Sequence, residues 1–227
     1  MGGSWSEVVG IFYRGEEFKC YGSSDIHYVS GLIRKYHIKK ENFMKKLILS
    51  LLFGIGFLAT TSFVYAEGFT LSSPDIVGQL SNKQVFNGFG CSGENISPKL
   101  NWGNAPEGTK SFAVTVYDPD APTGSGWWHW IIFDIPANVH SLKRNAGNIN
   151  EPIAPKGSIQ STTSFGQPGF GGACPPHGAS PHQYIFTVYA LKIDKLTLKA
   201  DATPALTGFY LGRNVLAKAS IVAYYSR

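Results

Sequence analysis

Phe112-Ala-Val-Thr-Val-Tyr-Asp-Pro-Asp-Ala-Pro122, followed by Trp127-Trp-His-Trp130, is the stretch around which this chain is organised. Its first six residues are apolar or β-branched, which predicts a buried strand. The strand ends on two carboxylates, Asp118 and Asp120, that alternate with prolines. A Gly-Ser-Gly turn then leads into a second predicted strand. We therefore expect both carboxylates and His129 near one rim of a sheet, where proteins usually keep their function.

The pattern of the chain from Phe69 onward also predicts β-structure, because short apolar runs alternate with Gly, Pro, Asn and Ser. One helix is predicted late in the chain, with Asp201 or Thr203 as its cap, Pro204 in its first turn and 205–211 continuing it. A second short helical turn is predicted over 214–217. Many short strands with turn signals predict a mainly β fold, an antiparallel β-sandwich with one or two small C-terminal helices. The predicted strands cover 69–72, 99–102, 111–117, 127–135, 158–160, 184–193 and 218–225.

Charge is unevenly distributed along the 227 residues, whose formal net charge is +5. Residues 67–227 contain 12 Lys and Arg against 10 Asp and Glu, so this part carries only +2. It is long enough for one domain with a sizeable core. A nucleic-acid partner is not expected, because no basic stripe with interleaved aromatic residues is present.

A targeting segment precedes that domain. Met44-Lys-Lys46 is a short positive region, Leu47–Leu58 is apolar, and Val64-Tyr-Ala66 supplies small residues at the positions that a signal peptidase reads. Cleavage is expected before Glu67. The apolar run is short for a membrane span, which needs about 20 residues.

We therefore predict a signal peptide over 44–66 and a domain over 67–227. The simplest account of residues 1–43 is a non-native upstream extension, with Met44 as the true start. The alternative is a genuine extension with an uncleaved anchor. Cleavage predicts a periplasmic or secreted protein with no stable membrane insertion.

The cysteines fit an exported domain. Residues 67–227 contain Cys91 and Cys174, and two cysteines in an oxidising compartment predict a disulfide. A thiol nucleophile or a metal pair is the alternative, but there is no Cys-x-x-Cys and no third soft ligand nearby. We predict neither a metal nor a cofactor.

Two separated motifs carry a resemblance to a known family. Asp118-Pro-Asp-Ala-Pro122 with Trp-x-His-Trp, and then Cys174-Pro-Pro-His-Gly178 with Pro181-His-Gln-Tyr184, resemble the phosphatidylethanolamine-binding protein family. The nearest branch is the bacterial Raf-kinase-inhibitor-like one, also called the YbhB/YbcL type. The resemblance implies a sandwich with Greek-key connections. It also implies an anion pocket whose matching positions here are Asp118, His129, Pro176, His182 and Tyr184, with Asp120 orienting the loop or a histidine.

The chemistry of these residues supports such a pocket. A histidine near a carboxylate can stay partly protonated at neutral pH and donate to an anion. Tyr184 follows His182 by two residues, so on a strand both side chains point to the same face. Pro176 supplies an apolar wall, and the loop Gly166–Gly172 is expected to be flexible and to flank the pocket. This set suits a phosphate monoester, a phospholipid headgroup or a small carboxylate.

Each residue also has a structural interpretation. Asp118 and Asp120 are in a sequence context typical of turn caps. His129, between tryptophans, fits a core histidine whose hydrogen bonds are satisfied, and the tryptophans themselves fit core and rim positions.

The first functional hypothesis is an exported, non-enzymatic binding protein for a small anion or phosphorylated headgroup. The resemblance implies that it modulates a partner kinase or protease. The second hypothesis is a hydrolase or metal-dependent enzyme that uses His129, His182 and Asp118. The first is favoured because no Gly-x-Ser-x-Gly, His-Glu-x-x-His or phosphate-binding loop motif is present. Exposed strand edges allow a homodimer without requiring one.

Overall fold

The structure is a computed structural model that describes residues 39–46 and 68–227. Contacts divide the chain into two units, residues 1–65 and 66–227. In the first unit, residues 39–46 form a short exposed helix. The apolar region and the cleavage site of the predicted signal peptide lie outside the described residues. Within the described residues, no helix is long and apolar enough to cross a membrane.

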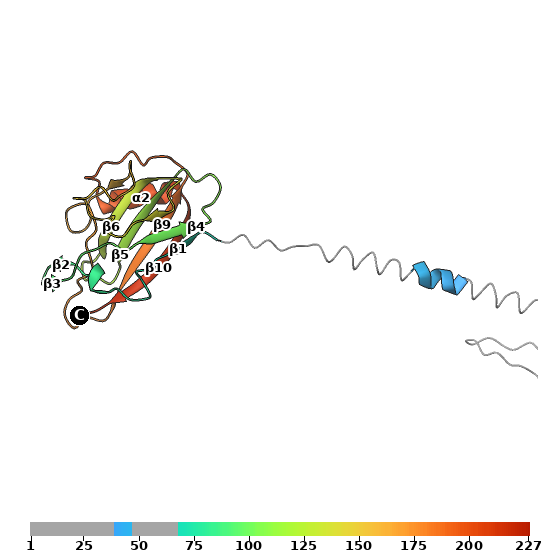
Figure 1. Cartoon of the computed structure of the whole chain (residues 1–227), viewed down its shortest axis with the longest axis horizontal. Coiled ribbons are helices and arrows are strands. Elements are labelled where there is room, and N and C mark those ends of the chain that lie inside the picture. Colours follow the sequence, from blue (N-terminus) through green and yellow to red (C-terminus); the bar gives the residue numbers. More distant parts are fainter. Residues whose placement is uncertain (1–38, 47–67) are drawn as a thin grey trace, which may run out of the picture. The chain divides into compact units, whose positions relative to one another are not determined.

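Antiparallel strands build the second unit, and the predicted mainly β sandwich is confirmed (Figure 1). The larger sheet has five strands and the second sheet has three. In spatial order the larger sheet contains β10 (Val215–Tyr225), β9 (His182–Leu191), β5 (Ser111–Asp118), β6 (Trp127–Pro136) and β8 (Ile159–Gln160). The smaller sheet contains β1 (Thr70–Ser72), β4 (Leu100–Gly103) and β7 (Ser141–Leu142). A separate hairpin pairs β2 (Asn87–Gly88) with β3 (Cys91–Ser92), and the helical elements are η2 (Asn82–Gln84) and α2 (Pro204–Asn214).

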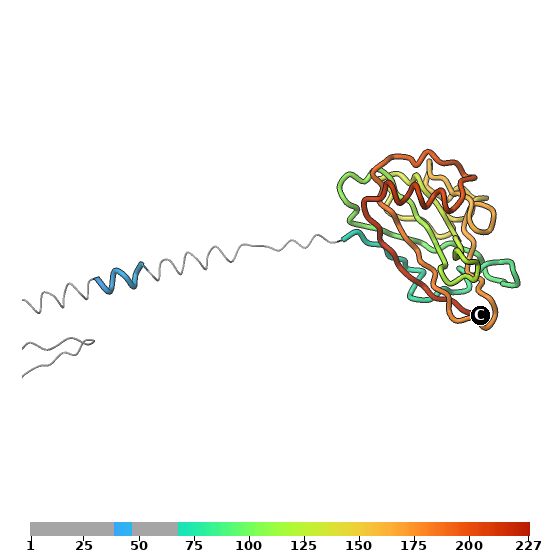
Figure 2. Tube along the Cα trace, turned by 180° about the vertical axis from the view of Figure 1, so that it is seen from behind, coloured from blue at the N-terminus to red at the C-terminus, as the bar shows by residue number. Residues whose placement is uncertain are grey.

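The central strand β5 is buried on both faces. Phe112, Val114 and Val116 belong to the core between the two sheets, together with residues of β1 and β4. Ala113 belongs to a second core on the other face, which Leu211 of α2 helps to form. Figure 2 shows α2 and the segment before it running across that face. Because both faces of β5 are buried, its sequence is an unbroken apolar run and does not alternate between apolar and polar residues.

A β-bulge in β6 lies at the end of the sheet that carries the motif residues. Val116 is paired with Trp130 and Tyr117 with Trp128, so His129 has no partner on β5. In a regular strand Trp128 and Trp130 would point to the same face. Here Trp130 enters the core between the sheets, whereas Trp128 packs against the second core. Bulges of this kind re-aim a side chain and are common next to functional sites.

The C-terminal elements differ in part from the prediction. The helix has Thr203 as its cap, whose hydroxyl accepts a hydrogen bond from the backbone N–H of Leu206 at 3.3 Å. The prediction of a second helical turn over 214–217 is wrong, because β10 begins at Val215, directly after the helix. Pairing of β10 with β9 over its whole length provides more hydrogen bonds than one further helical turn would.

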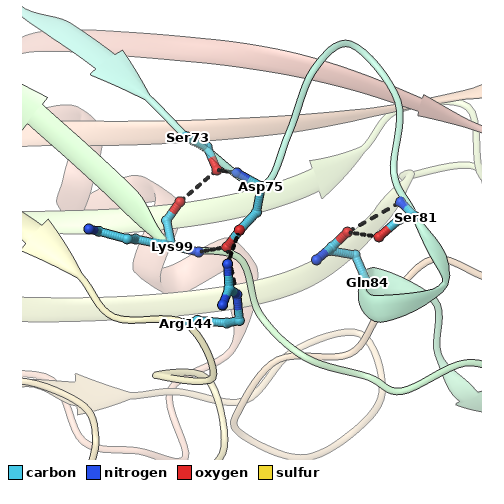
Figure 3. Close-up of polar contacts among 6 residues, drawn as sticks. All are labelled: Ser73, Asp75, Ser81, Gln84, Lys99 and Arg144. Atoms are coloured by element: carbon cyan, nitrogen blue, oxygen red, sulfur yellow. Dashed lines mark hydrogen bonds and ion pairs between the residues drawn. The ribbon is translucent and has the colours of Figure 1, made fainter.

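A polar cluster fastens the segment after β1 to β4 (Figure 3). A carboxylate oxygen of Asp75 accepts a hydrogen bond from the backbone N–H of Lys99 at 2.7 Å, and the Arg144 guanidinium forms an ion pair with the same carboxylate. The Ser73 hydroxyl donates to the Lys99 carbonyl at 2.6 Å. The hydrogen bond from Arg144 holds the pKa of Asp75 below its usual value. Nearby, the Gln84 amide oxygen accepts from the backbone and hydroxyl of Ser81, which closes the turn at η2.

Candidate functional site

Asp118 ends β5 with its carboxylate buried. One carboxylate oxygen lies 2.8 Å from Nδ1 of His182, the first residue of β9. The other accepts a hydrogen bond from the backbone N–H of Asp120 at 2.8 Å. Because a carboxylate only accepts hydrogen bonds, Nδ1 of His182 carries the hydrogen and donates it to Asp118. The pair therefore joins the ends of two neighbouring strands at one point.

Asp120 is exposed, and its carboxylate accepts a hydrogen bond from the backbone N–H of Gln183 at 2.8 Å. The loop after β5 is thus tied to the start of β9 directly beside His182. At the other end of this loop, Gly126 has a φ of +65°, and a Cβ there would lie 2.3 Å from the Tyr117 hydroxyl. Only glycine fits that position. The predicted orienting role of Asp120 is thus consistent with its contact to β9.

His129, the extra residue of the bulge, is only 4% exposed. Its Nδ1 lies 2.7 Å from the carbonyl oxygen of Gly171, and its own carbonyl accepts from the Gly171 N–H at 2.8 Å. A carbonyl can only accept, so Nδ1 carries the hydrogen and Nε2 presents a lone pair. Burial lowers the pKa of His129 to about 4, against the raising effect of the bond to Gly171. The expectation of a partly protonated histidine is therefore wrong for His129, because burial outweighs the charge of Asp118.

Tyr184 lies beside His129, with the two ring centroids 5.1 Å apart in an edge-to-face arrangement. The tyrosine is 1% exposed. Burial raises the pKa of its phenol above the usual value, and the negative charge of Asp118 adds to this effect, so the hydroxyl stays a neutral donor. Neither this hydroxyl nor Nε2 of His129 has a hydrogen-bond partner within the described ranges. A buried donor and a buried acceptor without partners, on adjacent rings, are unusual in a folded protein.

An open cavity of about 360 Å³ lies next to this group. Asp120, Pro176 and His182 line it, whereas Asp118, His129 and Tyr184 are buried and do not line it. The structure thus brings the predicted residues to one end of the sandwich, but divides them between the rim and the interior. His182 belongs to both, because it lines the cavity and donates to Asp118. The remaining lining residues are Pro122, Ala179, Ser180, Pro181 and Gln183.

The glycine-rich segment Gly166–Gly172 flanks the site, as its bond to His129 shows. Its last four residues are buried, however, and a Cβ on Gly171 would lie 2.2 Å from the Phe165 ring. The backbone N–H of Gly172 donates to the side-chain oxygen of Asn95 at 2.7 Å. This part of the segment is a packed strap rather than the flexible loop that its composition predicts, because the missing side chains let it approach its neighbours closely.

A disulfide joins Cys91 to Cys174, which are 83 residues apart in the chain. It connects the β2–β3 hairpin to the residues directly after the strap that positions His129. The backbone N–H of Phe86, just before the hairpin, also donates to the Ala173 carbonyl at 2.9 Å. The end of the strap is therefore held to the hairpin by a covalent bond and by backbone pairing. Across the parts of the chain that the structure describes, no group of three or more His, Cys, Asp or Glu side chains could hold a metal ion.

A family model described as phosphatidylethanolamine-binding protein matches residues 78–226. The chain belongs to the phosphatidylethanolamine-binding protein family. This confirms the resemblance drawn from the two motifs, and the protein is accordingly a binding protein of this family.

The most similar relatives include two Escherichia coli proteins of the family. YbcL is 48% identical over 80% of this chain and 98% of its own length, and YbhB is 48% identical over 65% of this chain and 92% of its own length. The crystal structure of YbcL, described as a new member of the mammalian family, matches with a TM-score of 0.70 and 50% identity. That match covers 71% of this chain and 99% of YbcL. Mycobacterium tuberculosis LppC, whose name describes a lipoprotein, is 34% identical over 64% of this chain and 66% of its own.

Some functional features were not visible in the sequence. The sequence did not reveal the bulge or the Gly171 carbonyl that fixes the tautomer of His129. It also did not reveal the backbone N–H of Gln183, which donates to Asp120. Two of these partners are backbone groups, which leave no residue type to recognise. The sequence contains one weak sign of the bulge. In Trp127-Trp-His-Trp130, aromatic side chains stand at consecutive positions, whereas a regular strand with one aromatic face would have them at alternate positions.

The disulfide is expected to stabilise the fold substantially. Replacing Cys91 and Cys174 by serine frees a long loop in the unfolded chain, and the free energy of unfolding should fall by about 4 kcal/mol. Urea unfolding with and without a reducing agent measures this difference, and reduction should leave the double variant unchanged. Equal stability of the oxidised and reduced wild type would contradict the expectation.

The lowered pKa of His129 makes stability depend on pH. Above its unfolded value of about 6.5, both states are neutral and the stability is complete. As the pH falls from 6.5 towards 4, only the unfolded state takes up the proton, so the free energy of unfolding drops by about 3 kcal/mol. Replacing His129 by Gln should remove this slope, measured by urea unfolding across the window. His140→Gln, at an exposed histidine, is the control and should keep the slope.

Proposed function

We propose that this protein is an exported binding protein whose site takes a phosphorylated headgroup of the phosphoethanolamine type. The observation that carries the proposal is the pair of buried atoms without partners, Nε2 of His129 and the hydroxyl of Tyr184, next to the Asp118–His182 pair. Burying a polar group without a hydrogen bond costs about 1–3 kcal/mol. A ligand that supplies one donor and one acceptor would recover that cost on binding.

The charges around the cavity favour a zwitterion over a simple anion. Asp118 and Asp120 contribute two carboxylates, whereas none of the residues lining the cavity is a lysine or an arginine. A ligand with only negative charge would be repelled by these carboxylates. An ammonium group would be attracted to Asp120, while phosphoryl oxygens could accept from the Tyr184 hydroxyl and from His182. The description of the matched family model points to the same class of headgroup.

Export is proposed from three independent features. The first is the targeting pattern over 44–66. The second is the Cys91–Cys174 disulfide, a bond that persists in oxidising compartments. The third is the relative LppC, which is named as a lipoprotein. A periplasmic or secreted location follows, and the proposed kinase or protease partner would be met there, at the surface around the cavity.

The hydrolase hypothesis keeps one supporting observation. An aspartate that orients a histidine at 2.8 Å is the base-activating half of a nucleophilic site, and Ser180 lines the same cavity as His182. A hydrolase should release nitrophenol from nitrophenyl acetate or phosphate, and should lose that rate in Ser180→Ala and His182→Ala. The binding proposal expects no turnover above the uncatalysed rate.

Ligand binding should raise the thermal stability of the folded protein. Phosphoethanolamine, phosphate, acetate and a nucleotide are compared, and phosphoethanolamine should give the largest shift. At a hundredfold excess over Kd the stabilisation is about 2.7 kcal/mol. Tyr184→Phe removes only the hydroxyl and should weaken phosphoethanolamine binding about tenfold, because the buried donor is lost.

Matched variants separate binding from folding. His140→Ala removes an exposed histidine elsewhere and should bind as the wild type does. Asp120→Asn should weaken phosphoethanolamine more than phosphate, since it removes the charge that attracts the ammonium group. If no anion or zwitterion raises the melting temperature, or if Tyr184→Phe binds unchanged, the proposed site is wrong.

A further inference from the structure

Residues 175–181, which we call the rim loop, join Cys174 to the start of β9 and are mostly exposed. Both ends of the loop are fixed, because Cys174 is in the disulfide and His182 is paired with Tyr225 of β10. The loop can therefore move only between these two ends. Half of the residues that line the cavity belong to it: Pro176, Ala179, Ser180 and Pro181.

Arg227 provides the hydrogen bonds that tie the rim loop to the rest of the fold. Its Nε donates to the Pro175 carbonyl at 2.5 Å, and its own carbonyl accepts from the Gly178 N–H at 3.1 Å. Within the described chain, residues 175–181 form no other hydrogen bond to the fold. Figures 1 and 2 show the end of the chain at the edge of the domain where this loop lies. One residue therefore holds the whole loop between its fixed ends.

The other segments around the buried His129 are held more firmly. Gly171 of the strap is hydrogen-bonded to His129 in both directions, and the next residue, Gly172, donates to Asn95. The loop after β5 is tied to β9 by the carboxylate of Asp120. Segments with few buried side chains and few hydrogen bonds open most readily. By this criterion the rim loop is the segment next to the site that opens first.

The unpartnered atoms of the site are shielded in this structure. Nε2 of His129 and the Tyr184 hydroxyl are buried, and neither residue lines the cavity. His182 connects the two regions, because it lines the cavity and donates to Asp118. The rim loop runs directly into His182, and Tyr184 follows two residues later on the same strand. Movement of the loop would therefore open the surface beside His182.

We propose that the rim loop is a lid that opens before a ligand reaches His129 and Tyr184, and that Arg227 is the positioning residue that keeps it closed. The part of this inference that concerns the ligand rests on the proposed headgroup function, whereas the opening itself does not. Opening breaks two hydrogen bonds, both at Arg227, and leaves the disulfide and the β9–β10 pairing intact.

Chemical modification of His129 measures the opening without any ligand. Diethyl pyrocarbonate acylates the unprotonated nitrogen of a neutral imidazole. His129 is neutral at neutral pH, because burial lowers its pKa to about 4, and its Nε2 carries the lone pair. Since the closed protein shields this atom, the rate of modification reports the fraction of molecules that are open. Mass spectrometry of peptides from the oxidised protein gives this rate relative to that of the exposed His140.

Arg227→Ala should speed the modification of His129 about tenfold, because the hydrogen bond from a charged donor to the Pro175 carbonyl is lost. Arg227→Lys retains a charged donor and should keep most of the protection. Arg213→Ala, which removes an exposed arginine from α2, is the matched control and should react at the wild-type rate. The rate at His140 should be the same in all of these variants.

The inference is overturned if His129 reacts at the wild-type rate in Arg227→Ala, or if wild-type His129 reacts as fast as His140. It is also overturned if Phe165→Ala, which removes the ring that contacts His129, speeds the reaction whereas Arg227→Ala does not. Access would then lie beside the strap.

A last arm separates the lid from the ligand. Phosphoethanolamine in excess should protect His129 from the reagent in Arg227→Ala, where the lid opens more often. If Arg227→Ala speeds the reaction but phosphoethanolamine gives no protection, the lid stands and the headgroup proposal fails.

Discussion

One unpaired residue in β6 determines the geometry of the whole site. Because His129 has no partner on β5, the strand turns between Trp128 and Trp130, and each tryptophan enters a different core. The same turn brings the imidazole against Tyr184 on β9, two strands away in the larger sheet, and against the Gly171 carbonyl of the strap. Without the bulge, either His129 or one tryptophan would point to the wrong face. Core packing and site geometry are therefore set by the same local irregularity.

The polar groups of the site are of two electrostatic kinds. Asp118 and His182 satisfy each other, so their contact positions the strands whether or not a ligand is bound. His129 and Tyr184 are neutral and buried, and their free atoms face a place where the protein itself provides no partner in the described part of the chain. This division separates the groups that hold the strand ends together from the neutral, buried groups that the proposed headgroup would have to reach. It also means that an anion gains little direct charge attraction from His129 at neutral pH.

The sequence predicted the features that are local and missed those that depend on distant contacts. The long strands and the helix could be predicted from apolar runs and from the two candidate caps, of which Thr203 is the one used. The grouping of Asp118, His129, His182 and Tyr184 was implied by the resemblance that the two motifs carry. The two-residue strands β2, β3 and β7 could not, because so short a run has no periodicity to detect. The prediction of a helical turn over 214–217 is wrong because it rests on local propensity. Local propensity carries no information about the pairing of β10 with the distant strand β9. The flexible loop predicted from Gly166–Gly172 failed in its last four residues for the opposite reason, since glycine also permits close packing.

The position of β5 in the sheet has a consequence for how the chain folds. Its pairing with β6 is a hairpin between neighbours in sequence, but its pairing with β9 joins residues 111–117 to residues 185–191. The central sheet cannot close until most of the domain has been synthesised, and such long-range pairing is typical of slowly folding proteins. During that delay the apolar run of β5 has one open edge and two uncovered faces. The nascent chain therefore exposes an apolar segment that holding chaperones can bind, and the export proposed above would use the same delay.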